Sequence, residues 1–216
     1  LLGFRAGQYM ASADEIYITI KGKGGHAAQP HLTTDTILVA SHLVVSLQQV
    51  ISRNNNPFSP SVLSICAFNG GYTTNVIPSE VKLMGTFRAM DETWRFKAHE
   101  IIKKQATELA HAMGAEIDID ILVGYPCLYN NEEVTERSRA LAGEYLGQDN
   151  VQDTEVRMGA EDFAFYSQII PACFFRLGTG NAAKGITSGV HTPTFDIDER
   201  AIETGIGTMA YLATQI

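Results

Sequence analysis

The chain has 216 residues, of which 45% are hydrophobic and 19% charged, as in a soluble globular protein with one large or two small cores. The net charge of -8 argues against nucleic acid and against an anionic membrane as partners, and no apolar run approaches the roughly 18 residues that span a bilayer. Three widely spaced cysteines without a C-x-x-C pair indicate reduced, mostly buried thiols and a cytoplasmic protein. Because the chain begins L-L-G-F-R, without an initiator Met, we expect it to be a piece of a longer protein.

Four segments of the first half read as strands, mostly because apolar and polar residues alternate along them. They are residues 14–21, 61–69, 81–89 and 115–122. Two helices are predicted between them. The first runs from Asp35, a suitable cap, to about Arg53 and is apolar around much of its girth. The second runs from Asp91 to about Met113, where Gly114 ends it.

The order β-α-β-β-α-β predicts a ferredoxin-like, four-stranded antiparallel sheet with both helices on one face. In that topology the strand at 61–69 lies on an edge of the sheet. An edge strand with apolar residues, beside a helix with surplus apolar residues, predicts the seam of a homodimer. The face without helices carries Tyr17, Thr19, Lys82 and Arg88, so it is polar and faces solvent or a neighbouring domain.

From residue 125 onward the pattern is that of an α/β domain. Helices are predicted at 132–146, after the stretch M-G-A-E-D-F at 158–163 up to Ile170, and from Asp198, a suitable cap, to the end, with a linker at 147–153. The run at 172–177 is continuously apolar, which is typical of a strand covered on both faces. These strands are too few for a doubly wound sheet, so we expect the missing ones before residue 1.

A glycine-rich segment, K-G-K-G-G-H-A-A-Q-P at residues 21–30, presents a histidine between regular elements. Its glycines allow backbone angles that other residues avoid, so the segment can hold His26 in an exposed position just before Pro30. The alternative is a flexible turn that carries an ordinary surface histidine. The flanking strand and helix favour the first interpretation.

Four other residues are candidates for chemistry, each with a structural alternative. His191 follows a glycine-rich loop after the predicted buried strand, where open α/β sheets bind ligands, and an imidazole suits zinc; one histidine, however, is not a site. Glu161 is a metal ligand, an acid that orients one, or a partner of a helix dipole. Arg88 binds a substrate carboxylate or pairs with a local acid, and Asn75 donates amide hydrogen bonds or stabilises a turn.

Together these stretches resemble the amidohydrolase branch of the M20 family of metallopeptidases, which includes N-acyl-amino-acid, hippurate and indole-acetyl-amino-acid hydrolases. The matching motifs are G-K-G-G-H-A-A-Q-P-H, N-G-G-Y-T-T-N-V-I-P followed by G-T-F-R, M-G-A-E-D-F, and G-V-H-T-P-T-F-D. They occur in the right order and extend over essentially the whole chain. Each motif alone would be a weak signal, and the four together are a strong one.

The resemblance implies a domain plan and an activity. Residues 14–122 look like a lid or dimerisation domain inserted into a catalytic domain of zinc-peptidase type, of which 1–13 and 123–216 are flanking parts. The implied activity is metal-dependent hydrolysis of the amide bond of N-acyl amino acids or short peptides. The implied cofactors are two divalent metal ions, zinc, manganese or cobalt, and the implied partner is a second copy of the chain.

The resemblance also implies roles for individual residues. His191 is a metal ligand, and His26 reaches into the partner subunit's site to polarise the scissile carbonyl. Asn75, Arg88 and Glu161 bind the substrate. The other ligands and the general base of this family lie upstream of such a stretch, so we expect this chain alone to be inactive and to bind metal weakly or not at all. The alternative is a ferredoxin-like dimerisation or small-molecule-binding module without catalysis, which would not need His191 or the strand before it.

Overall fold

The computed structural model describes residues 1–215, and these divide into two units, each with its own core. Unit 2 comprises residues 10–128 and 157–162. Unit 1 comprises residues 1–9, 129–156 and the part from Phe163 onward. The units are described one at a time below.

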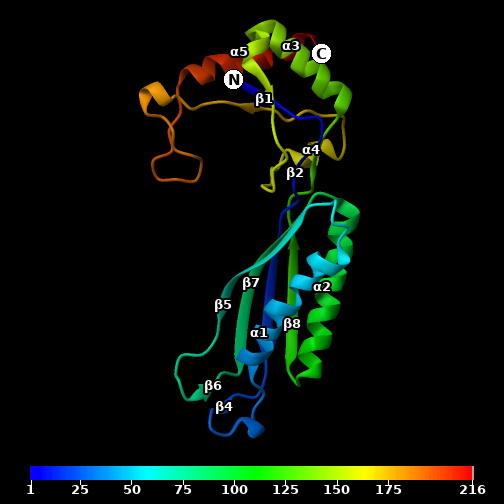
Figure 1. The fold of residues 1–216 in the computed structure, drawn as a ribbon, viewed down its shortest axis with the longest axis vertical. Helices are drawn as coiled ribbons and strands as arrows, with labels where there is room; N and C mark the ends of the chain where they lie inside the picture. Colours follow the sequence, from blue (N-terminus) through cyan, green and yellow to red (C-terminus); the bar gives the residue numbers. More distant parts are fainter. Residues whose placement is uncertain (216) are drawn as a thin grey trace. The chain divides into compact units, whose positions relative to one another are not determined.

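The sheet of unit 2 has the topology that the sequence predicts (Figure 1). β3 (Asp14–Lys21) pairs with β7 (Glu80–Ala89) on one side and β8 (Glu116–Val123) on the other. β5 (Ser61–Asn69) pairs with β7 and forms an edge. All three pairings are antiparallel. The order β5-β7-β3-β8 confirms the ferredoxin-like arrangement and the edge position of residues 61–69.

Both helices of unit 2 begin where the sequence predicts, at an aspartate cap. Asp35 accepts a hydrogen bond from a backbone N–H in the first turn of α1 (Thr36–Ser46), and Asp91 does the same for α2 (Glu92–Ala112). Beyond α2, Gly114 has a φ of 76°, a left-handed conformation that glycine adopts without strain. The helices therefore start and stop for local reasons, before packing is considered.

The first helix is shorter than predicted. α1 ends at Ser46, and a single wider π-helical turn, Val50–Asn54, follows it in place of an α-helix up to Arg53. The cause is a side chain of α2: Gln105 Nε2 donates to the Ser46 carbonyl oxygen at 2.7 Å. The first N–H of the π turn bonds to Leu47 O instead. A contact between helices has thus replaced a bond within the helix.

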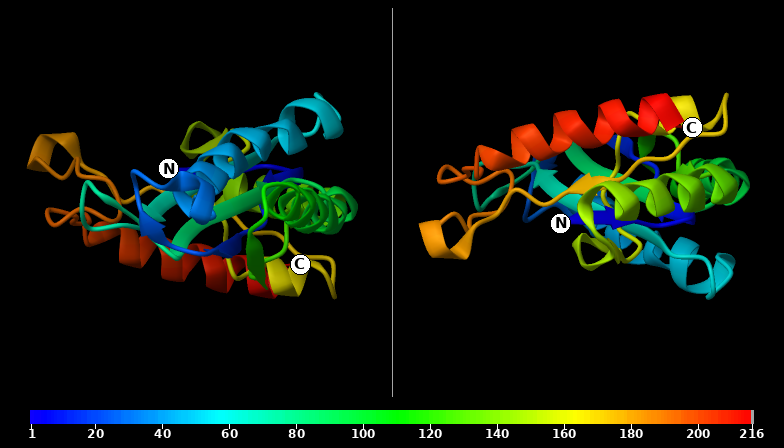
Figure 2. Two further views of the ribbon diagram at one scale, coloured as in Figure 1. Left: turned by 90° about the horizontal axis from the view of Figure 1, so that it is seen from below. Right: turned by 90° about the horizontal axis from the view of Figure 1, so that it is seen from above.

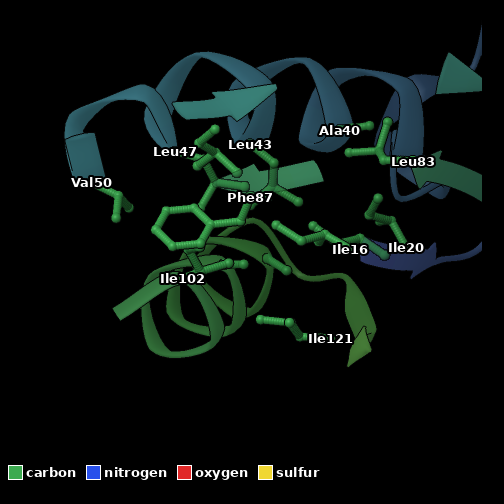
Figure 3. Packing of buried hydrophobic residues seen from close by; sticks show 14 of the residues in the cluster. Ile16, Ile20, Ala40, Leu43, Leu47, Val50, Leu83, Phe87, Ile102 and Ile121 are labelled. Carbon is green, nitrogen blue, oxygen red and sulfur yellow. The ribbon is translucent and has the colours of Figure 1, made fainter. Parts of the chain in front are cut away.

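One hydrophobic core fills the space between the helices and the sheet of unit 2 (Figure 3). The isoleucines of β3 alternate with more exposed neighbours, which directs all three into this core. α1 and α2 contact each other and the same face of the sheet (Figure 2). The fully buried residues labelled in Figure 3 come from strands and from both helical segments: Ile16, Ile20, Leu83, Phe87, Ala40, Leu43, Leu47, Val50 and Ile102.

Unit 2 also contains a small two-stranded ladder that no pattern in the sequence predicts. β4 (Gly25–His26) pairs with β6 (Val76–Ile77), and the 3₁₀ turn Pro30–Leu32 follows β4. Strands of two residues have no periodic pattern, so their sequence does not reveal them.

In unit 1, β1 (Leu2–Phe4) lies between two short strands. It pairs in parallel with β10 (Val151–Asp153) and antiparallel with β11 (Arg176–Leu177). α3 (Glu132–Leu146) and α5 (Arg200–Gln215) run alongside each other, with a stacked ring pair between them (Figure 2). The remaining elements are short: β2 (Gly7–Met10), β9 (Leu128–Asn130), α4 (Ala164–Ser167) and 3₁₀ turns at Gln148–Asn150 and Ala182–Lys184.

Two predictions for residues 147–170 are wrong. The predicted linker at 147–153 contains β10, and the helix predicted to follow M-G-A-E-D-F and to reach Ile170 is reduced to the four residues of α4. The carbonyl oxygens of Arg157 and Gly159 both accept the N–H of Ala11, at 3.2 and 3.1 Å. Residues 157–159, which lead into the predicted helix, are therefore bonded to another part of the chain, and α4 begins only at Ala164.

The strand predicted at 172–177 is also shorter, because only Arg176–Leu177 pairs with another strand. The amide of Asn130 takes the place of a neighbouring strand for the preceding residues: its Nδ2 donates to Phe174 O at 2.8 Å, and its Oδ1 accepts Phe174 N–H at 2.7 Å. Cys173 and Phe175 are half-buried rather than covered on both faces.

The burial of the cysteines and the character of the helices bear on two further expectations. All three cysteines are free, but Cys66 is exposed and only Cys127 is fully buried, so the prediction of mostly buried thiols is only partly right. Among residues 1–215, none of the helices combines the length and the apolar character that crossing a membrane requires.

A buried ionic network lies at one end of the unit 2 sheet. Asp14, with no exposed surface, accepts hydrogen bonds from the guanidinium of Arg95, from His99 at 2.9 Å and from the N–H of Gly124 at 3.1 Å. Arg95 also bonds to Glu92. Burial raises the pKa of Asp14, but the hydrogen bonds from Arg95, His99 and Gly124 outweigh it and hold the pKa at about 2, below the usual 3.8.

We predict that Asp14→Asn lowers the free energy of unfolding by about 3–5 kcal/mol, because it leaves Arg95 buried without its main counter-charge. The matched control is Asp118→Asn, which removes an exposed ion pair with Lys21 and should cost less than about 1 kcal/mol. Urea titrations of the three proteins measure both values. Losses of unfolding free energy that are small and equal in the two variants would contradict the prediction for Asp14.

The same titrations have a predicted pH dependence. Because the folded pKa of Asp14 lies below its ordinary value, its stabilisation is present above about pH 4 and is lost as the pH falls towards 2. A two-unit pKa difference corresponds to about 3 kcal/mol. The difference in stability between wild type and Asp14→Asn should therefore shrink in this window.

Candidate functional site

The glycine-rich segment and the Asn75 loop, far apart in the sequence, are joined by backbone hydrogen bonds in unit 2. His26 pairs with Val76 in the β4–β6 ladder, and the N–H of Ala27 donates to Asn75 O at 3.0 Å. At the start of the segment, the N–H of Gly22 donates a hydrogen bond to the carbonyl oxygen of Ser79, the residue just before β7. The structure thus brings two of the predicted site residues, His26 and Asn75, side by side.

One glycine of this segment is required by close packing. A Cβ on Gly24 would lie 2.7 Å from the carbonyl oxygen of Ile77 and 2.9 Å from the backbone nitrogen of Ser79. Only a residue without a side chain allows the two backbones to approach this closely. The segment is therefore a packed structure that presents His26, and not a flexible turn.

The orientation of the His26 ring is set by its own loop. The N–H of Ala28 donates to His26 Nδ1 at 3.1 Å, and the residue is exposed. A ring nitrogen that accepts a hydrogen bond carries no proton, so in the neutral imidazole the proton is on Nε2. His26 accordingly presents an N–H donor on its outer side.

A hollow of about 680 Å³ lies beside this pair, entirely within unit 2. It has the size of small-molecule sites, which are about 300–1,000 Å³. Its walls come from the glycine segment, from the loop that leads to Asn75 and from the start of β7, and they include Gly24, Gly25, Tyr72, Val76, Pro78 and Lys82.

Arg88, the third predicted residue of unit 2, lies at the other end of β7. Its Nη1 donates to Thr86 Oγ1 and to Phe87 O, and the side chain is half-buried. The tip with His26 adjoins Glu80, which is eight residues from Arg88 along an extended strand. At about 3.3 Å per residue the two ends are about 26 Å apart. The structure does not bring Arg88 to His26 within one chain.

His191 and Glu161 belong to different units. His191 is exposed in a loop of unit 1 and has a φ of 64°, a left-handed conformation that is uncommon for residues other than glycine. Glu161 is half-buried in unit 2 and precedes a turn. It does not start a helix, because α4 begins only at Ala164, so the helix-dipole interpretation of Glu161 is wrong.

The loop with His191 is anchored by an aspartate that the sequence analysis considered only as a helix cap. Asp198 accepts hydrogen bonds from Asn181 at 2.6 Å, Lys184 at 2.9 Å and Arg200 at 2.7 Å. Asn181 and Lys184 precede the loop and Arg200 follows it, so their hydrogen bonds to Asp198 hold the two ends of the loop together. Spacing alone gave no signal for this cluster, because its members meet only through the turns of the loop.

Metal and thiol chemistry can be tested against the side chains present. Within residues 1–215, no three His, Cys, Asp or Glu side chains come together as a metal site, so this donor set does not fit a complete two-metal centre.

The buried thiol of Cys127 is a poor nucleophile, because burial and the hydrogen bond with Glu92 raise its pKa to about 12.

Comparisons with known proteins agree on one family. A family model described as a peptidase dimerisation domain matches residues 12–117. IAA-amino acid hydrolase ILR1-like 4 of Arabidopsis thaliana is 33% identical over 215 residues, 98% of this chain and 49% of that protein. N-acetyldiaminopimelate deacetylase of Exiguobacterium sibiricum is 35% identical over 198 residues, 92% of this chain and 52% of that protein.

A solved structure leads to the same group. The YxeP protein of Bacillus subtilis, described as a dinuclear metal-binding peptidase of the M20 family, superposes with a TM-score of 0.73 at 27% identity. The match covers 100% of this chain and 54% of that one. The chain thus spans about half the length of the relatives it matches.

Proposed function

Because the chain belongs to the M20 family of metallopeptidases, we propose that it forms part of an enzyme that hydrolyses the amide bond of N-acyl amino acids or short peptides with divalent metal ions. Residues 14–122 are the lid or dimerisation domain in this proposal, and 1–13 and 123–216 are parts of the catalytic domain. The activities named for the relatives, a hydrolase of an amino acid conjugate and a deacetylase, support this class of reaction.

The observation that carries the proposal is the hydrogen bond from the N–H of Ala28 to His26 Nδ1, which leaves Nε2 to carry the proton of the neutral ring. Hydrolysis adds water to the amide carbon, breaks the C–N bond and transfers a proton to the departing amine. Negative charge develops on the carbonyl oxygen, and an exposed donor with a fixed orientation can stabilise that charge. This hydrogen bond gives His26 that character, and Asn75 lies on the same tip, where its carbonyl oxygen accepts the N–H of Ala27.

The length of β7 supports a site shared between two copies of the chain. Arg88 suits a substrate carboxylate, because within residues 1–215 its Nε and Nη2 donate to no acceptor. A single N-acyl amino acid cannot reach across the roughly 26 Å between Arg88 and His26. We therefore place His26 and Asn75 of one copy at the site to which the other copy contributes Arg88.

Surface chemistry supports β5 and α1 as the seam of this homodimer. β5 has no charged residue in its nine positions, whereas the opposite edge, β8, carries three acids: Glu116, Asp118 and Asp120. Edge strands are usually protected by charge, so an uncharged edge is available for pairing. Next to it, α1 exposes Leu38 and 75% of Val45.

The metal site of the proposal extends beyond this chain. We propose His191 as one ligand, presented by the loop that Asp198 closes. The dinuclear description of the YxeP protein supports metal chemistry for the family. In this proposal the remaining ligands and the general base come from outside these residues, so the chain alone should hydrolyse nothing, and its own contribution is substrate binding and charge stabilisation.

We predict that Val45→Lys raises the dissociation constant of the dimer by about tenfold or more, because it buries an unpaired charge in the seam. Sedimentation velocity over a range of concentrations measures this change. The control is the same substitution at Val123, which is 55% exposed at the end of β8 and should change the constant by less than about threefold. A wild-type chain that stays monomeric at high concentration would count against the seam.

We predict that His26→Ala in the intact enzyme lowers kcat by about 10²–10³-fold, the usual loss for one oxyanion donor. The control, His31→Ala, removes an exposed imidazole from the neighbouring 3₁₀ turn and should leave kcat unchanged. Steady-state rates on an N-acyl amino acid measure both. Wild-type turnover in His26→Ala would remove this residue from the reaction.

A further inference from the structure

An aromatic side chain stands fully exposed on the tip that carries His26 and Asn75. Tyr72 lies in the loop between β5 and β6, three residues before Asn75, and its relative exposure is 103%. A single exposed aromatic residue is common on protein surfaces. What sets this one apart is the packed base of its loop and the position of the loop.

The base of the loop is packed against the core of unit 2. A Cβ on Gly70 would lie 2.6 Å from Val81 Cγ2 and 3.3 Å from the end of Ile37, so only glycine fits there. Gly71 follows with a φ of 76°. Tyr72 is thus attached to a backbone whose position is fixed at the preceding residues, and its ring is presented without cover.

The position of the ring is shared with the candidate site. Tyr72 lines the same hollow as Gly25, the neighbour of His26, and as Val76, which is 51% exposed. On this tip the polar groups of His26 and Asn75 are therefore flanked by an aromatic and an aliphatic surface. Such a mixture recognises a ligand that has a polar centre and an apolar end.

We infer that Tyr72 is a specificity-determining residue that covers the aromatic acyl group of a substrate bound in the partner subunit. This inference rests on the proposed function. There, Arg88 of the other copy holds the carboxylate and His26 meets the carbonyl oxygen, so the part of the substrate beyond the carbonyl is the acyl group. An aromatic acyl group gains most from Tyr72, because ring pairs add to the burial of apolar area.

The test compares Tyr72→Ala with wild type in the intact enzyme, on N-benzoyl and N-acetyl derivatives of one amino acid. The ratio of kcat/KM for benzoyl over acetyl should fall by about tenfold, the scale of a lost apolar contact. Tyr72→Phe keeps the ring and should keep the ratio. Tyr17→Ala, which removes an exposed tyrosine from the sheet of unit 2, should also leave it unchanged.

Three results would overturn the inference, and they differ from one another. Equal losses on both substrates in an active enzyme exclude a role in acyl selection and leave the proposed function standing. Losses that disappear at protein concentrations high enough to restore the dimer assign Tyr72 to the seam instead. A wild-type enzyme that hydrolyses neither substrate refutes the proposed function, and the inference falls with it.

Discussion

The proposed site depends on the length of one strand, β7. It is ten residues long and hydrogen-bonded on both sides, to β5 and to β3, so it acts as a rigid spacer within unit 2. One of its ends adjoins the tip with His26, and the other carries Arg88. The separation of about 26 Å follows from the rise of an extended strand and not from loop conformation. A site that uses both residues on a small substrate must therefore combine two copies of the chain.

The two ends of this spacer are stabilised in different ways. At the tip, close backbone contact across Gly24 and the β4–β6 ladder fix the histidine, and a main-chain N–H sets its tautomer. At the other end, Thr86 Oγ1 donates to Asp14 O at 2.9 Å and accepts from Arg88. Hydrogen bonds through Thr86 thus connect the backbone of Asp14 with the guanidinium proposed to bind substrate.

The sequence predicts the sheet and the helix starts of unit 2 and the long helices α3 and α5 of unit 1, but not the end of α1 or the segment before Phe174, for physical reasons. Strands β3 and β7 alternate strictly, and Asp35 and Asp91 cap their helices with their own side chains, so local patterns are sufficient. In contrast, the end of α1 depends on Gln105, and the segment before Phe174 depends on the side chain of Asn130. Hydrogen bonds between residues that are far apart in the chain produce no periodic pattern in the sequence. The same holds for the candidate site: residue types and motifs pointed to His26, Asn75 and Arg88, but only the structure places the first two together and the third far away.

Mixing two variants, each impaired in one of the two residues, tests the shared site most directly. His26→Ala and Arg88→Ala of the intact enzyme are combined in equal amounts, and hydrolysis is measured after subunit exchange at a substrate concentration well below the KM of Arg88→Ala, where weakened binding lowers the rate. If His26 acts across the dimer, each mixed dimer has one intact site, and activity should return to about a quarter of the wild-type value. If both residues serve the same subunit's site, no mixed dimer contains an intact site, and activity that stays at the mean of the two variants would contradict the account.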